Sequence, residues 1–137
     1  MNHAAQEASI IPLRILLVDD HELVRKSVSL LLKSDRRWEV CGEAGNSDEA
    51  IERALELRPD VVILDLSLPT LGGLNVASAI RQAVPSTKII FFSVMESQMG
   101  SQIAQHGDAF VAKGSAATDL PLALERVLLQ RGSFPDA

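Results

Sequence analysis

Short apolar runs alternate along the chain with segments in which apolar residues recur every three or four positions. Four of the runs are nearly continuous in apolar residues, which is typical of strands covered on both faces. The fifth, Trp38–Ala44, alternates more and is expected nearer the sheet edge. The predicted strands, in chain order, are Leu13–Val18, Trp38–Ala44, the strand Val61–Leu64 that leads into Asp65, Lys88–Ser93 and Ala109–Lys113.

The segments between and after these runs predict helices with one buried face, because their apolar residues follow helical spacing. We expect the inward-facing residues to be Val24, Val28, Leu31 and Leu32; Ala50, Ile51, Ala54 and Leu55; Val76, Ala77, Ile80 and Val84; and Leu120, Leu124, Val127 and Leu128. The segment Glu96–Gly107 has few apolar residues, and Gly100 costs about 1 kcal/mol relative to Ala inside a helix. A short, mobile helix is expected there.

Three residues carry the helix-start predictions. Asp19 and Glu22 are spaced to form a capping pair at the first helix, and Ser47 is expected to cap the second. Pro59 and Pro85 mark the ends of the second and third helices, because proline does not continue a helix.

Five strands alternating with five helices predict right-handed crossovers and a parallel sheet covered on both faces, which is an α/β fold. The 137 residues, 47% of them hydrophobic, suit one domain with a real core. We place this domain at residues 13–130, with a disordered leader at 1–12 and a tail or linker start at 131–137.

Charge and composition exclude several classes of partner. Thirteen basic and 18 acidic residues give a net charge of −5 without a Lys/Arg cluster, so direct nucleic-acid binding is not expected. No apolar run approaches the roughly 18 residues of a membrane span. The one cysteine, Cys41, excludes an internal disulfide and fits a reducing compartment. A cytoplasmic protein is therefore expected.

Side chains capable of chemistry stand at the ends of four predicted strands: Asp19 and Asp20, Asp65, Ser93 and Lys113. In a parallel sheet these ends share one edge, which is where ligands bind in open α/β folds. Each residue alone has an ordinary structural role, as a helix cap, turn residue or solvated charge. Asp65 itself could be a nucleophile, a metal ligand or a loop cap, but the joint placement favours chemistry.

Three carboxylates at one edge require compensating positive charge, because like charges raise each other's pKa. Lys113 supplies one cation, and Mg²⁺ is the natural second, since it takes one or two carboxylates together with phosphate oxygens. A carboxylate beside such groups is suited to attack a phosphoryl group and form an aspartyl phosphate. Ser93 could then offer its hydroxyl to the phosphoryl oxygens.

These motifs resemble the receiver domain of two-component response regulators over about residues 13–130. The resemblance is closest to the NarL/FixJ-like (LuxR-type) subfamily. It is carried by Leu16-Leu17-Val18-Asp19-Asp20-His21, Glu43-Ala44-Gly45, Asp60-Val61-Val62-Ile63-Leu64-Asp65-Leu66 and Phe92-Ser93-Val94. The resemblance implies a flavodoxin-like (βα)5 fold, a doubly wound five-stranded parallel sheet of strand order 2-1-3-4-5.

The resemblance also implies a role for each residue. Asp65 is the phosphoacceptor and Lys113 pairs with the phosphate. Mg²⁺ is bound by Asp20, Asp65 and the backbone carbonyl of Ser67, with Asp19 acting through water. Ser93 is the switch hydroxyl and Phe110 the switch aromatic residue.

The implied function is a phosphorylation-controlled signalling switch rather than an enzyme with an external substrate. The expected partners are a sensor histidine kinase and a second copy of the chain on phosphorylation, with DNA reached only through a separate effector domain. A stand-alone receiver is the alternative. A haloacid-dehalogenase-type phosphohydrolase is disfavoured, because that chemistry wants an acid two residues after the nucleophile, where this chain has Ser67.

Two departures from the family pattern are visible. From Ser93 to Lys113 the chain is a couple of residues shorter than usual, and the deficit falls in the weak fourth helix. Lys113 is followed by Gly114 where many receivers have Pro, so no cis peptide is expected there.

Overall fold

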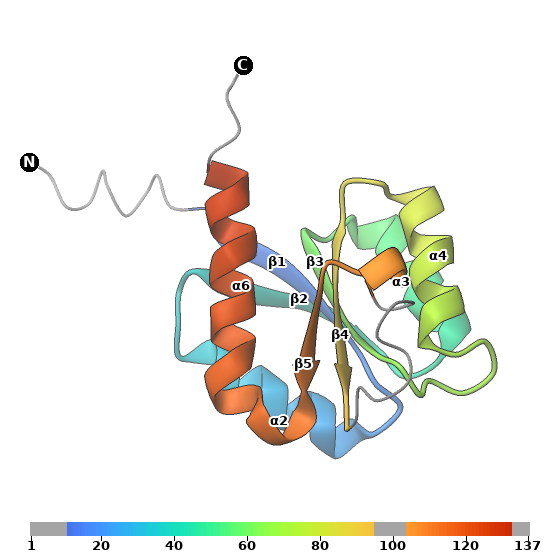
Figure 1. Ribbon diagram of the computed structural model, residues 1–137, viewed down its shortest axis with the longest axis horizontal. Helices are drawn as coiled ribbons and strands as arrows, with labels where there is room; N and C mark the ends of the chain where they lie inside the picture. Colours follow the sequence, from blue (N-terminus) through green and yellow to red (C-terminus); the bar gives the residue numbers. More distant parts are fainter. Residues whose placement is uncertain (1–10, 95–103, 133–137) are drawn as a thin grey trace, which may run out of the picture.

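The computed structural model describes residues 11–94 and 104–132 (Figure 1). Within them, five strands form one parallel sheet in the order β2-β1-β3-β4-β5. This confirms the predicted sheet and its strand order. The strands are β1 (Leu13–Val18), β2 (Trp38–Ala44), β3 (Val61–Asp65), β4 (Lys88–Ser93) and β5 (Ala109–Ala112).

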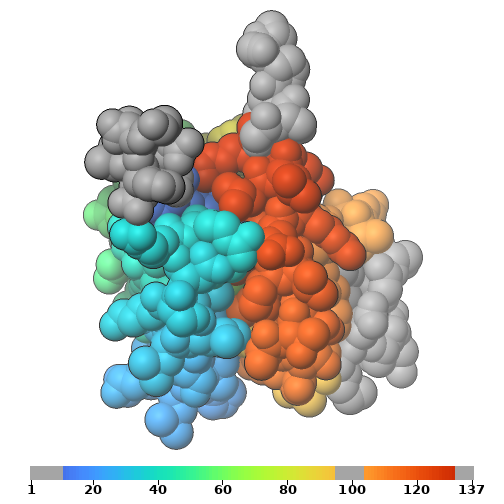
Figure 2. Space-filling view, turned by 90° about the vertical axis from the view of Figure 1, so that its left-hand side faces the viewer, coloured from blue at the N-terminus to red at the C-terminus, as the bar shows by residue number. Residues whose placement is uncertain are grey.

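Helices cover both faces of the sheet, so the domain has three layers (Figure 1). Helices α2 (Glu22–Lys33) and α6 (Ala116–Gly132) pack on one face, and α3 (Ser47–Leu57) and α4 (Gly73–Ala83) on the other. Figure 2 shows the first of these faces, where the orange and red surface of α6 lies beside the blue and cyan surface that includes α2.

Each face of the sheet has its own hydrophobic cluster, and successive residues of a strand are divided between them. In β3, Val61 and Ile63 join the cluster under α2 and α6, whereas Val62 and Leu64 join the cluster under α3 and α4. This division follows from the alternation of side chains along a strand. It explains why the central strands are apolar at every position.

The predicted caps of the first two helices are wrong. Helix α2 has His21 at its N-cap, without a side-chain cap hydrogen bond, and Asp19 instead accepts a hydrogen bond from the His21 backbone N–H at 2.9 Å. At α3 the N-cap is Asn46, whose Oδ1 accepts from the Glu49 N–H at 2.9 Å. Ser47 lies one residue inside the helix and points elsewhere: its hydroxyl donates to the Pro69 carbonyl at 2.8 Å.

Three smaller expectations also differ from the structure. Leu55 is 47% exposed, because the small residues Ala50 and Ala54 form the contact of α3 with the sheet. Strand β5 ends at Ala112, and Lys113 begins the short 3₁₀ helix η2 (Lys113–Ser115). Helix α6 continues through Gly132, past the predicted start of the tail at residue 131.

Two predicted segments fall mostly outside the described residues: the leader at 1–12 and the fourth helix at Glu96–Gly107. Of the latter, residues 104–106 are described and helical. Among the described residues, no helix is both long and apolar enough to cross a membrane.

Candidate functional site

Three strands deliver the predicted site residues to one edge of the sheet. Asp19 follows β1, Asp65 ends β3 and Lys113 follows β5. Side-chain alternation continues from Leu17, Ile63 and Val111, which belong to the cluster under α2 and α6, so the three polar residues project toward the same side. Residues nearly a hundred positions apart thereby become neighbours.

Asp65 is almost fully enclosed, with 1% of its surface exposed. Its Oδ1 accepts hydrogen bonds from the backbone N–H and the hydroxyl of Ser67, both at 3.1 Å. Its Oδ2 has no hydrogen-bond partner among the described residues, and the Lys113 Nζ lies 3.7 Å away. One carboxylate oxygen is thus held in place while the other stays available.

Lys113 bridges the two buried carboxylates. Its Nζ lies 2.7 Å from Asp19 Oδ2, closer than to Asp65, and 5.7 Å from the centroid of the Phe92 ring. The side chain of Lys113 is only 18% exposed and that of Asp19 only 4%. A single ammonium group therefore faces two enclosed carboxylates, which leaves the edge short of positive charge.

Burial raises the pKa of Asp65 above its ordinary value, and the nearby charge of Asp19 raises it further. The hydrogen bonds from Ser67 and the charge of Lys113 act in the opposite direction but do not cancel the rise. The negative form of Asp65 is therefore costly in this setting, and an additional cation would stabilise it.

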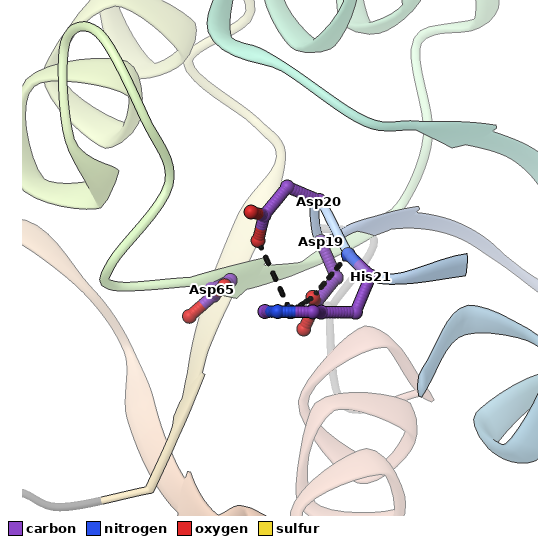
Figure 3. A group of neighbouring side chains, drawn as sticks. All are labelled: Asp19, Asp20, His21 and Asp65. Carbon is purple, nitrogen blue, oxygen red and sulfur yellow. Dashed lines mark hydrogen bonds and ion pairs between the residues drawn. The ribbon is translucent and has the colours of Figure 1, made fainter. Parts of the chain in front are cut away.

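The edge has the donor set that Mg²⁺ requires. Ligand atoms of Asp19, Asp20, His21 and Asp65 all lie within 4.8 Å of one another (Figure 3). Three of the four are carboxylates, Asp65 Oδ2 lacks a hydrogen-bond partner, and Asp20 and His21 open the cluster to solvent. Oxygen donors with one side open to water suit a cation that keeps several of its waters. The residues therefore fit the ion that the sequence predicted.

Ser93 and Phe110 lie on neighbouring strands, and alternation directs both toward the α3 and α4 side. Ser93 pairs with Ala112 and is 7% exposed. Phe110 pairs with Phe91 and packs, partly buried, against the cluster under α3 and α4. Ser93 follows Phe92, the register partner of Asp65, so the hydroxyl stands one residue beyond the acid.

Three further residues shape this edge and had no role in the sequence prediction. Arg25 donates to the Asp19 carbonyl at 2.6 Å and to Glu43 at 2.8 Å, and no linear motif marks this link. His21 belongs to the motif after the first strand, and that motif does not predict that its ring faces the acids. At Gly73 a Cβ would stand 2.6 Å from the Asp65 carbonyl oxygen, so the turn after β3 requires glycine.

The chain is similar to known response regulators along most of its length. The regulator GacA of Pseudomonas viridiflava is 32% identical over 84% of this chain and 55% of its own length. The nitrate/nitrite regulator NarL of Escherichia coli K12 is 34% identical over 84% of this chain and 54% of its own. This chain thus spans about half the length of these two relatives.

A solved structure gives the same result. The two-component response regulator of the LuxR family from Aurantimonas sp. SI85-9A1 superposes with a TM-score of 0.82 at 31% identity, over 88% of this chain and 87% of that one. The family model described as "Response regulator receiver domain" matches residues 15–125, which contain β2 to β5, all but the first two residues of β1, and the whole acidic edge. Sheet order, acidic edge and matched residues agree: the chain belongs to the response regulator receiver domain family, of the NarL and LuxR type.

Proposed function

We propose that this domain is a signalling switch in which Asp65 accepts a phosphoryl group from a sensor histidine kinase. One observation carries the proposal: a buried carboxylate presents an oxygen without a hydrogen-bond partner next to Lys113 and an acid pair. Structural carboxylates at this depth normally have all their oxygens satisfied. An unsatisfied one at the carboxyl edge of the sheet is suited to react.

In the proposed step, Asp65 Oδ2 attacks the phosphorus atom of a phosphohistidine. A bond forms between this oxygen and phosphorus, and the bond from phosphorus to the histidine nitrogen breaks. Ser67 holds Oδ1 through two hydrogen bonds and so orients the nucleophile. Lys113 pairs with the arriving phosphoryl oxygens, which relieves charge on the transferred group.

Mg²⁺ belongs to the same proposal. Asp20, Asp65 and the backbone carbonyl of Ser67 would hold it directly, and Asp19 would act through water. When bound, the ion supplies positive charge that stabilises the transferring group. Without it, three carboxylates share one ammonium, so phosphorylation of Asp65 is expected to require the ion.

The switch would use Ser93 and Phe110, whose side chains face α3 and α4. The phosphoryl group on Asp65 draws in the Ser93 hydroxyl, and Phe110 turns into the space vacated. Phosphorylation shifts the population toward the active form only by interacting better with it. The active form would bind a partner or a second copy of the chain.

The output proposed is transcriptional control in the cytoplasm. GacA and NarL are response regulators roughly twice as long as the matched part, and an effector domain beyond this region would contact DNA. A stand-alone receiver is the alternative. The phosphohydrolase alternative is weakened because the hydroxyl of Ser67, which is not an acid, occupies the position two residues after Asp65.

Acetyl phosphate with Mg²⁺ tests the proposal. We expect one phosphoryl group per chain, stable in acid and labile in base, detected by intact-mass spectrometry. Asp65→Asn should remove the labelling because its amide cannot act as the nucleophile. The matched control is Asp48→Asn, an exposed carboxylate of α3, which should label normally.

Two outcomes would contradict the proposal. Equal labelling of Asp65→Asn and wild type would place the phosphoryl group elsewhere. Sustained turnover of many phosphate esters would indicate a hydrolase instead.

A further inference from the structure

His21 is placed at the acidic edge in a way that helix capping does not explain. It occupies the N-cap of α2 with an extended backbone, φ −99° and ψ 113°, yet its side chain makes no cap hydrogen bond. Its ring turns toward the acids instead: Nδ1 is within hydrogen-bond distance of Asp19 Oδ1, at 3.1 Å, and lies 3.2 Å from Asp20 Oδ1 (Figure 3). The ring is therefore part of the acidic cluster.

These separations match those between adjacent ligands of a six-coordinate ion. For bonds of about 2.1 Å, neighbouring ligand atoms of an octahedron stand about 3.0 Å apart, and opposite ones about 4.2 Å. Ligand atoms of Asp19, Asp20, His21 and Asp65 lie within 4.8 Å of one another. An ion held by Asp20 and Asp65 would therefore have His21 Nδ1 within reach, with Asp19 acting through water.

A separate observation points to a cation as the ligand of this cluster. Asp65 is 99% buried, and its Oδ2 has no hydrogen-bond partner among the described residues. The opposite side of the cluster is open, since the His21 side chain is 66% exposed and that of Asp20 is 31% exposed. An ion can enter past His21 and reach the buried acid.

We propose that His21 adds a nitrogen ligand to this site and thereby shifts its selectivity toward borderline first-row transition ions such as Co²⁺. The proposal rests on the metal site of the proposed function. Imidazole nitrogen suits these borderline ions, whereas Mg²⁺ takes oxygen ligands and keeps its waters. The imidazole nitrogen thus raises the affinity for borderline transition ions and adds little to the affinity for Mg²⁺. Both classes would use the same carboxylates.

The test compares wild type with His21→Gln in titrations of Mg²⁺ and Co²⁺ on the whole chain at mildly alkaline pH. Co²⁺ affinity should fall about tenfold or more in His21→Gln, while Mg²⁺ affinity should change by less than about twofold. Pulsed electron paramagnetic resonance of the Mn²⁺-loaded wild type should show coupling to an imidazole ¹⁴N. That coupling should disappear in His21→Gln.

The other histidines provide controls, because an imidazole outside the cluster could also bind metal. His3→Gln and His106→Gln should keep both the nitrogen coupling and the Co²⁺ affinity. Loss of the coupling in either one, or its absence from wild type, would overturn the inference. Equal Co²⁺ affinity in wild type and His21→Gln would also overturn it.

Labelling by acetyl phosphate with Mg²⁺ separates this inference from the proposed function. If Asp65 is labelled and Mg²⁺ binds but the nitrogen coupling is absent, only the role of His21 is wrong. If Asp65 is not labelled while Mn²⁺ shows the coupling, the metal site stands and the phosphoacceptor proposal fails.

Discussion

Arg25 joins the loop after β1, which carries part of the acidic edge, to the end of strand β2. Its guanidinium donates to the Asp19 carbonyl after β1 and to the Glu43 carboxylate near the end of β2. The Arg25 side chain is 18% exposed and its bond to the Asp19 carbonyl is partly buried, whereas its bond to Glu43 is exposed. Arg25 touches no reacting atom in this arrangement. It acts by fixing the backbone from which Asp19, Asp20 and His21 project.

Replacing Arg25 by methionine should therefore weaken both the fold and the metal site. The loss of a charged donor to two partners should lower the free energy of unfolding by about 1.5–3 kcal/mol. Mg²⁺ affinity should also fall, because the acidic loop is no longer held. Urea unfolding and Mg²⁺ titration measure the two effects. Lys26→Met is the matched control, since Lys26 is exposed and its ion pair within the described part of the chain is with Glu22 at 3.5 Å.

If Arg25 positions the acidic loop, Arg25→Met must lower both the free energy of unfolding and the Mg²⁺ affinity. Unchanged Mg²⁺ affinity in a folded Arg25→Met variant would show that the loop keeps its shape without the guanidinium.

Asp35 makes a second residue-scale prediction, on pH dependence. Hydrogen bonds from Arg37 lower its pKa from the ordinary 3.8. The folded state thus favours the charged form, so this stabilisation is present above pH 3.8 and is lost as pH falls below it. Asp35→Asn should cost about 0.5 kcal/mol at neutral pH, as is usual for partly exposed pairs.

The difference between Asp35→Asn and wild type in urea unfolding should shrink toward zero at the acid end. Glu39→Gln, an exposed carboxylate of β2, should show no such trend. A cost for Asp35→Asn that stays constant from neutral pH to below pH 3.8 would mean that the Arg37 contact contributes nothing to stability.

At the scale of elements, hydrophobic periodicity predicted the strands and most helices, because burial on two faces leaves a strong pattern in the sequence. It could not resolve which polar residue caps a helix. Asn46 and Ser47 are adjacent and both suit a cap; only the path of the loop around Pro69 decides that Ser47 turns to that carbonyl. Such choices depend on tertiary contacts that no local pattern records.

The acidic edge could be predicted from the sequence, because it follows from the regular geometry of the sheet. Parallel strands bring Asp19, Asp65 and Lys113 to the same edge, and alternation turns them to the same side. The roles of Arg25 and Gly73 cannot be predicted from such a pattern, because they arise from close contacts between different segments of the fold.

Asn46→Ala tests the corrected cap. Removing the acceptor of the Glu49 N–H should lower the free energy of unfolding by about 1 kcal/mol. Urea unfolding gives the value, and Ser34→Ala is the control, since Ser34 is an exposed C-cap whose hydroxyl donates to the nearby Leu31 carbonyl. An Asn46→Ala variant as stable as wild type would show that Asn46 does not hold the start of α3.

At the scale of the molecule, the site residues and Trp38 lie at opposite ends of the strands. Asp19, Asp65 and Lys113 gather at the carboxyl edge, whereas Trp38 pairs with Leu13 at the amino end of β1. Trp38 is 5% exposed and lies 4.4 Å under the Arg37 guanidinium, within the cluster that α2 and α6 cover. The length of the strands therefore separates the indole ring of Trp38 from a change at the acidic edge.

Trp38 fluorescence should therefore change little when Mg²⁺ binds and change strongly when urea unfolds the domain. An ion held by Asp20 and Asp65 would have no direct contact with the indole ring, but unfolding exposes the ring to water and removes Arg37 from it. A positive control is Val94→Trp in a Trp38→Phe background, because Val94 is 74% exposed directly after Ser93. That reporter should respond to Mg²⁺. Strong direct quenching of Trp38 by Mg²⁺ would contradict the separation of the two edges and the strand register on which it rests.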